Sequence, residues 1–127
     1  MSQVETNKAI IKLYFEAYNT KNEAIFDEII APDYIDHGQS YYVGSPGRGV
    51  AGAKNDLKNS LDKFDDSSYV IEAMIASDHL PDLVGTYWKG SLTPKASPSD
   101  AQHINKIIRS GVISNSKWKN DRNLACY

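Results

Sequence analysis

The sequence is short of several features that mark whole classes of protein. It has a single cysteine, Cys126, so it forms no internal disulfide. Lys and Arg number 14 against 16 Asp and Glu. The positive excess usual in proteins that bind nucleic-acid backbones is therefore missing, and we expect no nucleic-acid partner. No run approaches the ~20 apolar residues of a membrane span, and the N-terminus lacks the basic-then-apolar pattern of a secretion signal. We expect a cytoplasmic protein with no membrane partner.

The motifs of metal, phosphate and nucleophile chemistry are also missing. The three histidines, His37, His79 and His103, have no His-x-x-x-His spacing, and no Cys-x-x-Cys pair exists. The glycines between positions 44 and 52 lack the Lys-Ser or Lys-Thr partner of a phosphate loop. No Gly-x-Ser-x-Gly turn is present. We therefore expect no metal site and no nucleotide site.

The composition fits one folded domain over residues 1–127. Apolar residues make up 41% and charged residues 24%, which is ordinary for a globular protein and argues against disorder. The length matches one domain.

The first half predicts three amphipathic helices. Ser2 and Glu5 have the spacing of a capping box, and an apolar stripe follows at residues 10, 11, 14, 15 and 18. A second helix is expected from the Asn22 cap to Ala31, before Pro32. A third runs from residue 50 to residue 64, with Asp56 placed on its solvent side.

The second half predicts strands. Residues 68–76 place Tyr69, Ile71, Ala73 and Ile75 on one face. Residues 83–92 form a second strand, and residues 102–109 and 112–119 are expected to form a hairpin around Ser110-Gly111. Helices followed by strands favour an α+β fold. Three helices packed on one face of a curved antiparallel sheet would give a cone with an internal pocket.

Several side chains have the chemistry of a small-molecule site. His37, in Asp36-His37-Gly38, is suited to proton transfer at the mouth of an apolar cavity, or it hydrogen-bonds a loop carbonyl. Tyr14 and Tyr18 lie one helical turn apart, either as donors to a developing oxyanion or as core aromatics. Each of three further aromatic residues either contacts a ligand or belongs to the core: Tyr34, Trp88 and Trp118. His103 lies on a predicted strand and is either a site residue or a structural histidine.

Two segments resemble a known family. Residues 10–19, IIKLYFEAYN, are similar to the opening helix of SnoaL-like proteins in the nuclear transport factor 2-like superfamily. Residues 26–37, FDEIIAPDYIDH, are similar to the family's helix, Pro-Asp-Tyr turn and strand-borne Asp-His. The resemblance covers essentially the whole chain. It implies an α+β cone with an apolar pocket, commonly a homodimer, and enzymes such as polyketide cyclases and ketosteroid isomerase that move protons next to a carbonyl without metal or organic cofactor.

The resemblance also implies roles for individual residues. Tyr14 matches an oxyanion donor of ketosteroid isomerase, His37 matches its general base, and His103 falls close to its second donor. Ser116 and Trp118 stand where the cyclases carry His and Asp, with Asp121 nearby. We expect an apolar, carbonyl-bearing ligand, with His37, Tyr14 and His103 as catalytic residues. The expected ligand contacts are Tyr18, Tyr34, Asp36, Trp88 and Trp118. Two alternatives stay open: a binding module without turnover, and an association module that uses the outer sheet face.

Overall fold

The computed structural model describes residues 2–40, 44–95, 104–114 and 125–126, the last two ranges by their backbone alone. The element order is α1 (Gln3–Thr20), α2 (Ala24–Ile29), β1 (Ile35–Asp36), a short 3₁₀ helix η1 (His37–Gln39), β2 (Gly47–Arg48), α4 (Gly49–Lys63), β3 (Phe64–Ser77), β4 (Leu80–Pro94), β5 (Ile104–Ser114) and β6 (Ala125–Cys126). Helices precede the long strands, so the α+β class is confirmed.

Helix α1 begins at its predicted cap, whereas α2 ends at Ile29, two residues before the predicted Ala31. The Glu5 backbone N–H donates to Ser2 Oγ at 3.1 Å, which is the predicted cap of α1. The predicted Asn22 cap of α2 is displaced by one residue: Glu23 occupies the N-cap position without a side-chain capping bond, and Asn22 Oδ1 accepts from the Ala24 backbone N–H at 3.2 Å. Gly49 opens α4 with φ +61°, a conformation that favours glycine, and an added Cβ would lie 3.1 Å from the Pro32 carbonyl oxygen.

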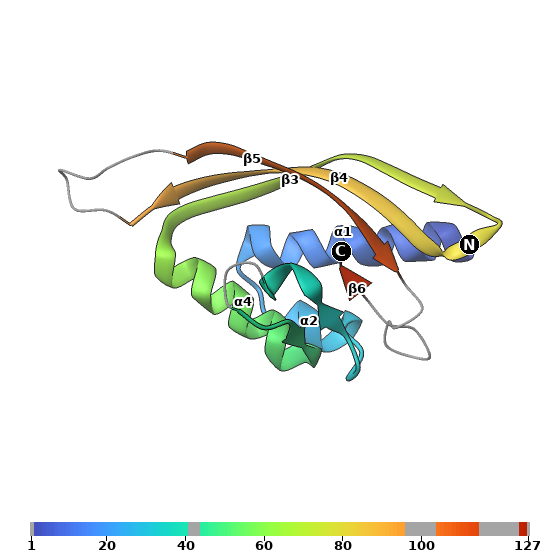
Figure 1. Ribbon diagram of the computed structural model, residues 1–127, viewed down its shortest axis with the longest axis horizontal. Coiled ribbons are helices and arrows are strands. Elements are labelled where there is room, and N and C mark those ends of the chain that lie inside the picture. The colour runs from blue at the N-terminus through green and yellow to red at the C-terminus, as the bar shows by residue number, and fades with distance from the viewer. Residues whose placement is uncertain (1, 41–43, 96–103, 115–124, 127) are drawn as a thin grey trace.

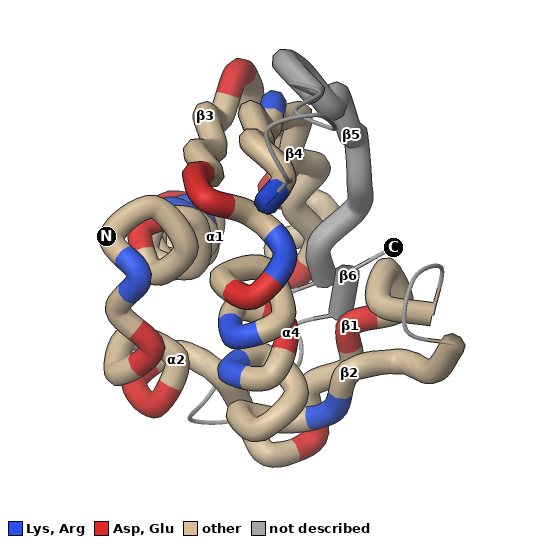
Figure 2. Tube along the Cα trace, turned by 90° about the vertical axis from the view of Figure 1, so that its left-hand side faces the viewer, with Lys and Arg blue, Asp and Glu red and all other residues tan. Residues whose placement is uncertain are grey.

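The strands form one mixed sheet in the order β2-β1-β6-β5-β4-β3. All neighbouring strands are antiparallel except β1 and β6, which are parallel. Figure 1 shows β3, β4 and β5 as one layer arching over α1, with α2 and α4 on the same side of the sheet. The view in Figure 2 shows α4 between α2 and the short strands β1 and β2. The arrangement matches the predicted packing of helices on one sheet face.

The predicted hairpin at Ser110-Gly111 is wrong. Strand β5 runs without interruption from Ile104 to Ser114, and Ser110 and Gly111 pair with Tyr87 and Thr86 in its interior. A Ser-Gly pair is a weak turn signal when β-branched residues flank it on both sides. The 15-residue β4 offers a partner along the whole length of β5, so the extended conformation is favoured.

The predicted faces of β3 also need a correction. The register between β3 and β4 shifts between Ile71 and Ala73, which is a β-bulge. Tyr69 and Ile71 share the core face, but beyond the bulge Met74 and Ala76 replace Ala73 and Ile75 on that face. Ile75 is 77% exposed as a result.

The core lies between the helices and the inner sheet face, and it is rich in aromatic side chains. Its buried members come from α1, α2, the turn before β1, α4 and β4; they are Ile11, Tyr14, Phe15, Ala17, Tyr18, Phe26, Ile29, Ile30, Tyr34, Ala53, Leu57 and Val84. Burial of this apolar surface supplies the main stabilisation of the fold.

Candidate functional site

Three tyrosine hydroxyls meet inside the core. Tyr14 and Tyr18 share one face of α1, because residues four apart lie one above the other on a helix. Tyr34 reaches the same point from the turn before β1, a turn in which its own N–H donates to the Ala31 carbonyl at 3.1 Å. Tyr14 Oη lies 3.4 Å from Tyr18 Oη and 3.5 Å from Tyr34 Oη. The structure thus brings together three of the predicted site residues as one buried polar cluster.

Asp56 of α4 completes this cluster. The Tyr18 hydroxyl donates to Asp56 Oδ2 at 2.5 Å. The prediction that Asp56 faces solvent is therefore wrong. The helical spacing carries the missed signal, since Asp56 stands three residues after Ala53 and directly before Leu57, both of which are buried. We refer below to Tyr14, Tyr18, Tyr34 and Asp56 as the tyrosine–Asp56 cluster.

Burial and charge alter the acidity of this region. Burial raises the pKa of the Tyr18 phenol well above its ordinary value, and the nearby Asp56 carboxylate raises it further. Burial also raises the pKa of Asp36, with a smaller contribution from Asp56, while hydrogen bonds from Gln39 and Gly38 oppose the rise. Asp36 therefore keeps its proton to a higher pH than an exposed aspartate does.

Asp36 is held by the start of the 3₁₀ helix. It is only 5% exposed, and its Oδ1 accepts from the Gly38 backbone N–H at 2.9 Å. Its Oδ2 accepts from Gln39 Nε2 at 3.3 Å, and the same Gln39 nitrogen donates to the Gly52 carbonyl at 3.1 Å. The Gln39 amide therefore links the Asp36 carboxyl to α4. Asp36 also lies near enough to Asp56 to be affected by its charge.

His37 is the first residue of η1, and its side chain is exposed. The tyrosine–Asp56 cluster is joined by the contacts of Tyr14 with Tyr18 and Tyr34 and by the hydrogen bond from Tyr18 to Asp56. Two further predicted residues, His103 and Trp118, lie outside the described residues, as does Asp121.

Trp88 belongs to an aromatic group next to the cluster. Its ring centroid lies 5.5 Å from that of Phe15 and 5.6 Å from that of Tyr69. Phe26 lies on the other side, 5.5 Å from Tyr18 by ring centroids. Thr86, also on the inner face of β4, has a buried hydroxyl with no hydrogen-bond partner among the described residues. The surroundings of the cluster are thus apolar, with a few polar atoms.

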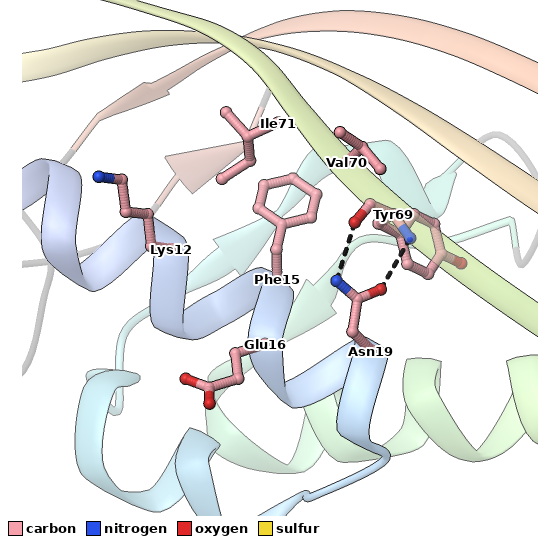
Figure 3. Close-up of a pocket in the computed structure, with 7 residues that line it drawn as sticks. All are labelled: Lys12, Phe15, Glu16, Asn19, Tyr69, Val70 and Ile71. Atoms are coloured by element: carbon pink, nitrogen blue, oxygen red, sulfur yellow. Dashed lines mark hydrogen bonds between the residues drawn. The ribbon is translucent and has the colours of Figure 1, made fainter.

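The described residues also outline a hollow on the outside of the core. It has a volume of about 350 Å³ and lies between α1 and β3. Its lining is Lys12, Phe15, Glu16, Asn19, Tyr69, Val70 and Ile71, as Figure 3 shows.

Within the described ranges, no group of three or more His, Cys, Asp or Glu side chains is placed to hold a metal ion. No helix in those ranges is both long and apolar enough to cross a membrane.

Comparison with known proteins shows the family and the fold. The model of the family described as SnoaL-like polyketide cyclase matches residues 8–122. No curated protein matches the chain significantly.

Three solved structures have a similar fold. An NTF2-like protein of Burkholderia pseudomallei superposes with a TM-score of 0.70 at 13% identity, covering 100% of this chain and 91% of that one. A Catenulispora acidiphila protein with a ketosteroid isomerase-like fold, in complex with trimethylamine, has a TM-score of 0.68 at 12% identity, covering 93% and 83%. TerC, co-crystallised with polyporic acid, has a TM-score of 0.65 at 14% identity, covering 95% and 89%.

Proposed function

Because the chain belongs to the SnoaL-like polyketide cyclase family, we propose that it binds a small apolar molecule bearing a carbonyl group, with an oxygen of the ligand at Tyr14. The observation that carries the proposal is the tyrosine–Asp56 cluster, in which three buried hydroxyls and a carboxyl converge inside an aromatic core. Ligand sites are commonly apolar hollows with a few convergent polar groups. Tyr18, Tyr34, Asp36 and Trp88 are the proposed contacts, together with Trp118.

We further propose that the protein moves a proton next to that carbonyl. In this mechanism His37 takes the proton, and Tyr14 and His103 hydrogen-bond the oxygen on which negative charge develops. The internal pocket of a cone-shaped fold would exclude water from this step. Membership of a family described by a polyketide cyclase supports this class of reaction.

Two relatives support a small-molecule ligand. The TerC crystal holds polyporic acid, a hydroxyquinone with aryl substituents, and the Catenulispora acidiphila protein holds trimethylamine. Polyporic acid combines an apolar body with carbonyl and hydroxyl groups, so it is the first compound to test on this chain.

Binding without turnover is the second candidate function. The exposure of His37 favours it, because a general base must come within hydrogen-bond reach of the proton it removes. Both candidates use the same ligand site, so one experiment separates them.

A homodimer through the outer sheet face is the proposed assembly. Val70, Ile75 and Tyr87 are exposed large apolar residues of β3 and β4. Ile75 pairs with Gly85 and Ala73 pairs with Tyr87, which places these side chains on the face opposite the core. Covering such a patch is favourable, and Ile75→Lys should shift a dimer to monomer in light scattering.

The test of function measures binding and proton transfer separately. Calorimetry with polyporic acid and a panel of aryl ketones tests binding. Proton NMR of the same ketones in D₂O, with catalytic amounts of protein, follows exchange of the hydrogens next to the carbonyl. Catalysis predicts exchange that is lost in His37→Ala and kept in His79→Ala, a matched exposed histidine in the turn between β3 and β4. Binding without exchange supports the second candidate, and no binding by any compound contradicts both.

A further inference from the structure

The outer edge of β3 carries backbone groups with which none of the described strands pairs. Among those strands, β3 is the last in the sheet order and pairs with β4 alone. The backbone groups of successive strand residues point alternately to the two sides of the strand. Those of Tyr69 point away from β4, because they bond to the Asn19 amide. Those of Ile71, two residues further on and before the bulge, therefore point to the same outer edge.

The Asn19 side chain occupies one position of an additional strand. Its amide both donates to and accepts from the Tyr69 peptide groups, as a neighbouring strand would. Figure 3 shows Asn19 at the Tyr69 end of the hollow between α1 and β3, with Ile71 further along β3. An extended segment in the hollow would continue at Ile71 the pairing that Asn19 makes at Tyr69.

The hollow has the size and the lining for such a segment. Its volume of about 350 Å³ lies at the lower end of the range for ligand sites. Phe15 and Ile71 contribute apolar side chains to its lining, and Val70, which is 57% exposed, lies on the opposite face of β3. Since strand side chains alternate between faces, an added strand would place one set beside Phe15 and the other beside Val70.

Two features of the edge keep the added segment short. The Asn19 amide already occupies the Tyr69 position, and the bulge between Ile71 and Ala73 bends the strand. Features of this kind protect edge strands from forming long sheets with other molecules. The edge is therefore better suited to a short peptide than to a long strand of a second copy.

The charges around the hollow indicate the kind of peptide. Lys12 is exposed and belongs to none of the ion pairs found among the described residues. Figure 3 shows the Lys12 side chain at the end of the hollow away from Asn19, whereas the Glu16 carboxylate points away from β3. An acidic side chain on the same face of the peptide as its apolar residue, two positions away, would meet Lys12.

We propose that the β3 edge at Ile71 and the adjoining hollow bind a short extended peptide of a partner protein, paired antiparallel to β3. The peptide places an apolar residue opposite Ile71 and beside Phe15, and an acidic residue two positions earlier faces Lys12. In this mode of recognition, main-chain hydrogen bonds supply affinity and alternate side chains supply selectivity. The peptide site and the tyrosine–Asp56 cluster of the proposed function use different residues, and neither requires the other.

The first experiment measures amide hydrogen exchange by NMR in the ¹⁵N-labelled wild type. The Val70 N–H points to β4 and the Tyr69 N–H is bonded to Asn19, so both should exchange slowly. The Ile71 N–H should exchange about tenfold faster or more. An Ile71 amide as protected as Val70 at every protein concentration would mean that the chain itself covers the edge. Protection that grows with protein concentration would mean that a second copy covers it, and either result overturns the proposal.

The second experiment titrates the protein with the peptide acetyl-Thr-Val-Thr-Asp-Thr-Val-amide. The peptide ends at the Val that pairs with Ile71, because Asn19 occupies the next position. Binding should be saturable and should shift the Ile71 amide signal. At a free peptide concentration of about ten times Kd, exchange of the Ile71 amide should slow about tenfold. The absence of saturable binding below about 1 mM, or binding that leaves Ile71 exchange unchanged, overturns the proposal.

Two N-methylated forms of this peptide test the backbone pairing. In an antiparallel pair, the last Val exchanges two hydrogen bonds with Ile71, while the N–H of the Thr before it points away from β3. N-methylation of that Val should weaken binding about tenfold or more, and N-methylation of the Thr should change it by less than about twofold. Equal affinity of the two methylated peptides, or the larger loss in the Thr form, contradicts the pairing.

Lys12→Glu tests the preference for an acidic peptide. The variant should bind the peptide about two- to fivefold more weakly, and it should bind a form with Lys in place of Asp more tightly than the wild type does. Lys58→Glu makes the same charge change at an exposed position of α4 and should alter neither affinity by more than about twofold. Unchanged affinities in Lys12→Glu, or equal changes in Lys58→Glu, overturn the proposed class of peptide.

Discussion

Asn19 of α1 holds the edge of the sheet, and its removal gives a direct test of how helix and sheet are joined. Strand β3 is the last strand of the sheet order, so among the described strands none pairs with its outer edge. Asn19 Nδ2 donates to the Tyr69 carbonyl at 2.8 Å, and the Tyr69 backbone N–H donates to Asn19 Oδ1 at 2.7 Å (Figure 3). The amide thus pairs with Tyr69 as a backbone peptide group would.

The expected loss follows from these two bonds. An average intramolecular hydrogen bond contributes about 0.5–1.5 kcal/mol, so two contribute about 1–3 kcal/mol. Alanine is a better helix former than asparagine by about 0.5 kcal/mol. Asn19→Ala should therefore lower the free energy of unfolding by about 0.5–2.5 kcal/mol.

Urea denaturation followed by circular dichroism measures this difference. The midpoint should fall while the slope stays the same, since the surface exposed on unfolding is unchanged. Asn55→Ala, at an exposed position of α4, is the matched control, and it should raise the stability by about 0.5 kcal/mol.

Asn19→Asp tests the geometry more closely. The carboxylate can still accept from the Tyr69 N–H, but its second oxygen would face the Tyr69 carbonyl and repel it. The variant should be destabilised at neutral pH and should recover part of the loss in acid, where the protonated carboxyl can donate to that carbonyl. Stability equal to the wild type in both Asn19 variants would refute the view that this amide closes the sheet edge.

Three further predictions concern the site and its frame. Tyr14→Phe should weaken binding of any ligand found for the wild type by about tenfold, since it removes one hydrogen bond, as calorimetry would measure. Asp36→Asn should alter how stability depends on pH. Burial raises the pKa of Asp36 above its ordinary value of 3.8 in the folded protein. Ionisation of Asp36 therefore lowers the free energy of unfolding of the wild type as pH rises from 3.8 through the folded pKa. The variant lacks this loss, so its stability relative to the wild type should increase over that pH window. Gly49→Ala should cost about 1–2 kcal/mol in urea denaturation, because alanine is strained at φ +61°.

Each of these predictions has an outcome that contradicts it. Unchanged affinity in Tyr14→Phe would remove Tyr14 from the ligand site. A difference between Asp36→Asn and wild type that is constant with pH would show that Asp36 is not the group responsible. A Gly49→Ala protein as stable as the wild type would mean that α4 can begin with ordinary backbone geometry.

The features that the sequence predicts correctly depend on neighbouring residues. The Ser2 cap and the apolar stripe of α1 need only a few consecutive positions, and the structure confirms both. The unbroken β5 and the bulge in β3 depend on pairing with β4. Strand pairing is decided by residues far apart in the chain, so patterns within one segment do not determine it.

The candidate site also contains residues that the sequence alone predicts and residues that depend on contacts between distant segments. Tyr14 and Tyr18 are recognisable as a pair because helical spacing alone brings them together. Tyr34 joins them through a turn, and Asp56 joins through a hydrogen bond from α4 to Tyr18 of α1, which a single helix pattern does not specify. Asp56 was assigned to the solvent side because charged residues usually lie there. It is half-buried, and its hydrogen bond to Tyr18, 38 positions away, offsets the loss of water contact.

The central claim is that a ligand oxygen binds at the tyrosine–Asp56 cluster, and the most direct measurement is a titration of ¹³Cζ-tyrosine-labelled protein with polyporic acid. The account predicts saturable shifts of Tyr14, Tyr18 and Tyr34, while Tyr87 on the outer sheet face stays unchanged. Shifts confined to Tyr69, which lines the hollow between α1 and β3, or no shift at any tyrosine, would contradict it.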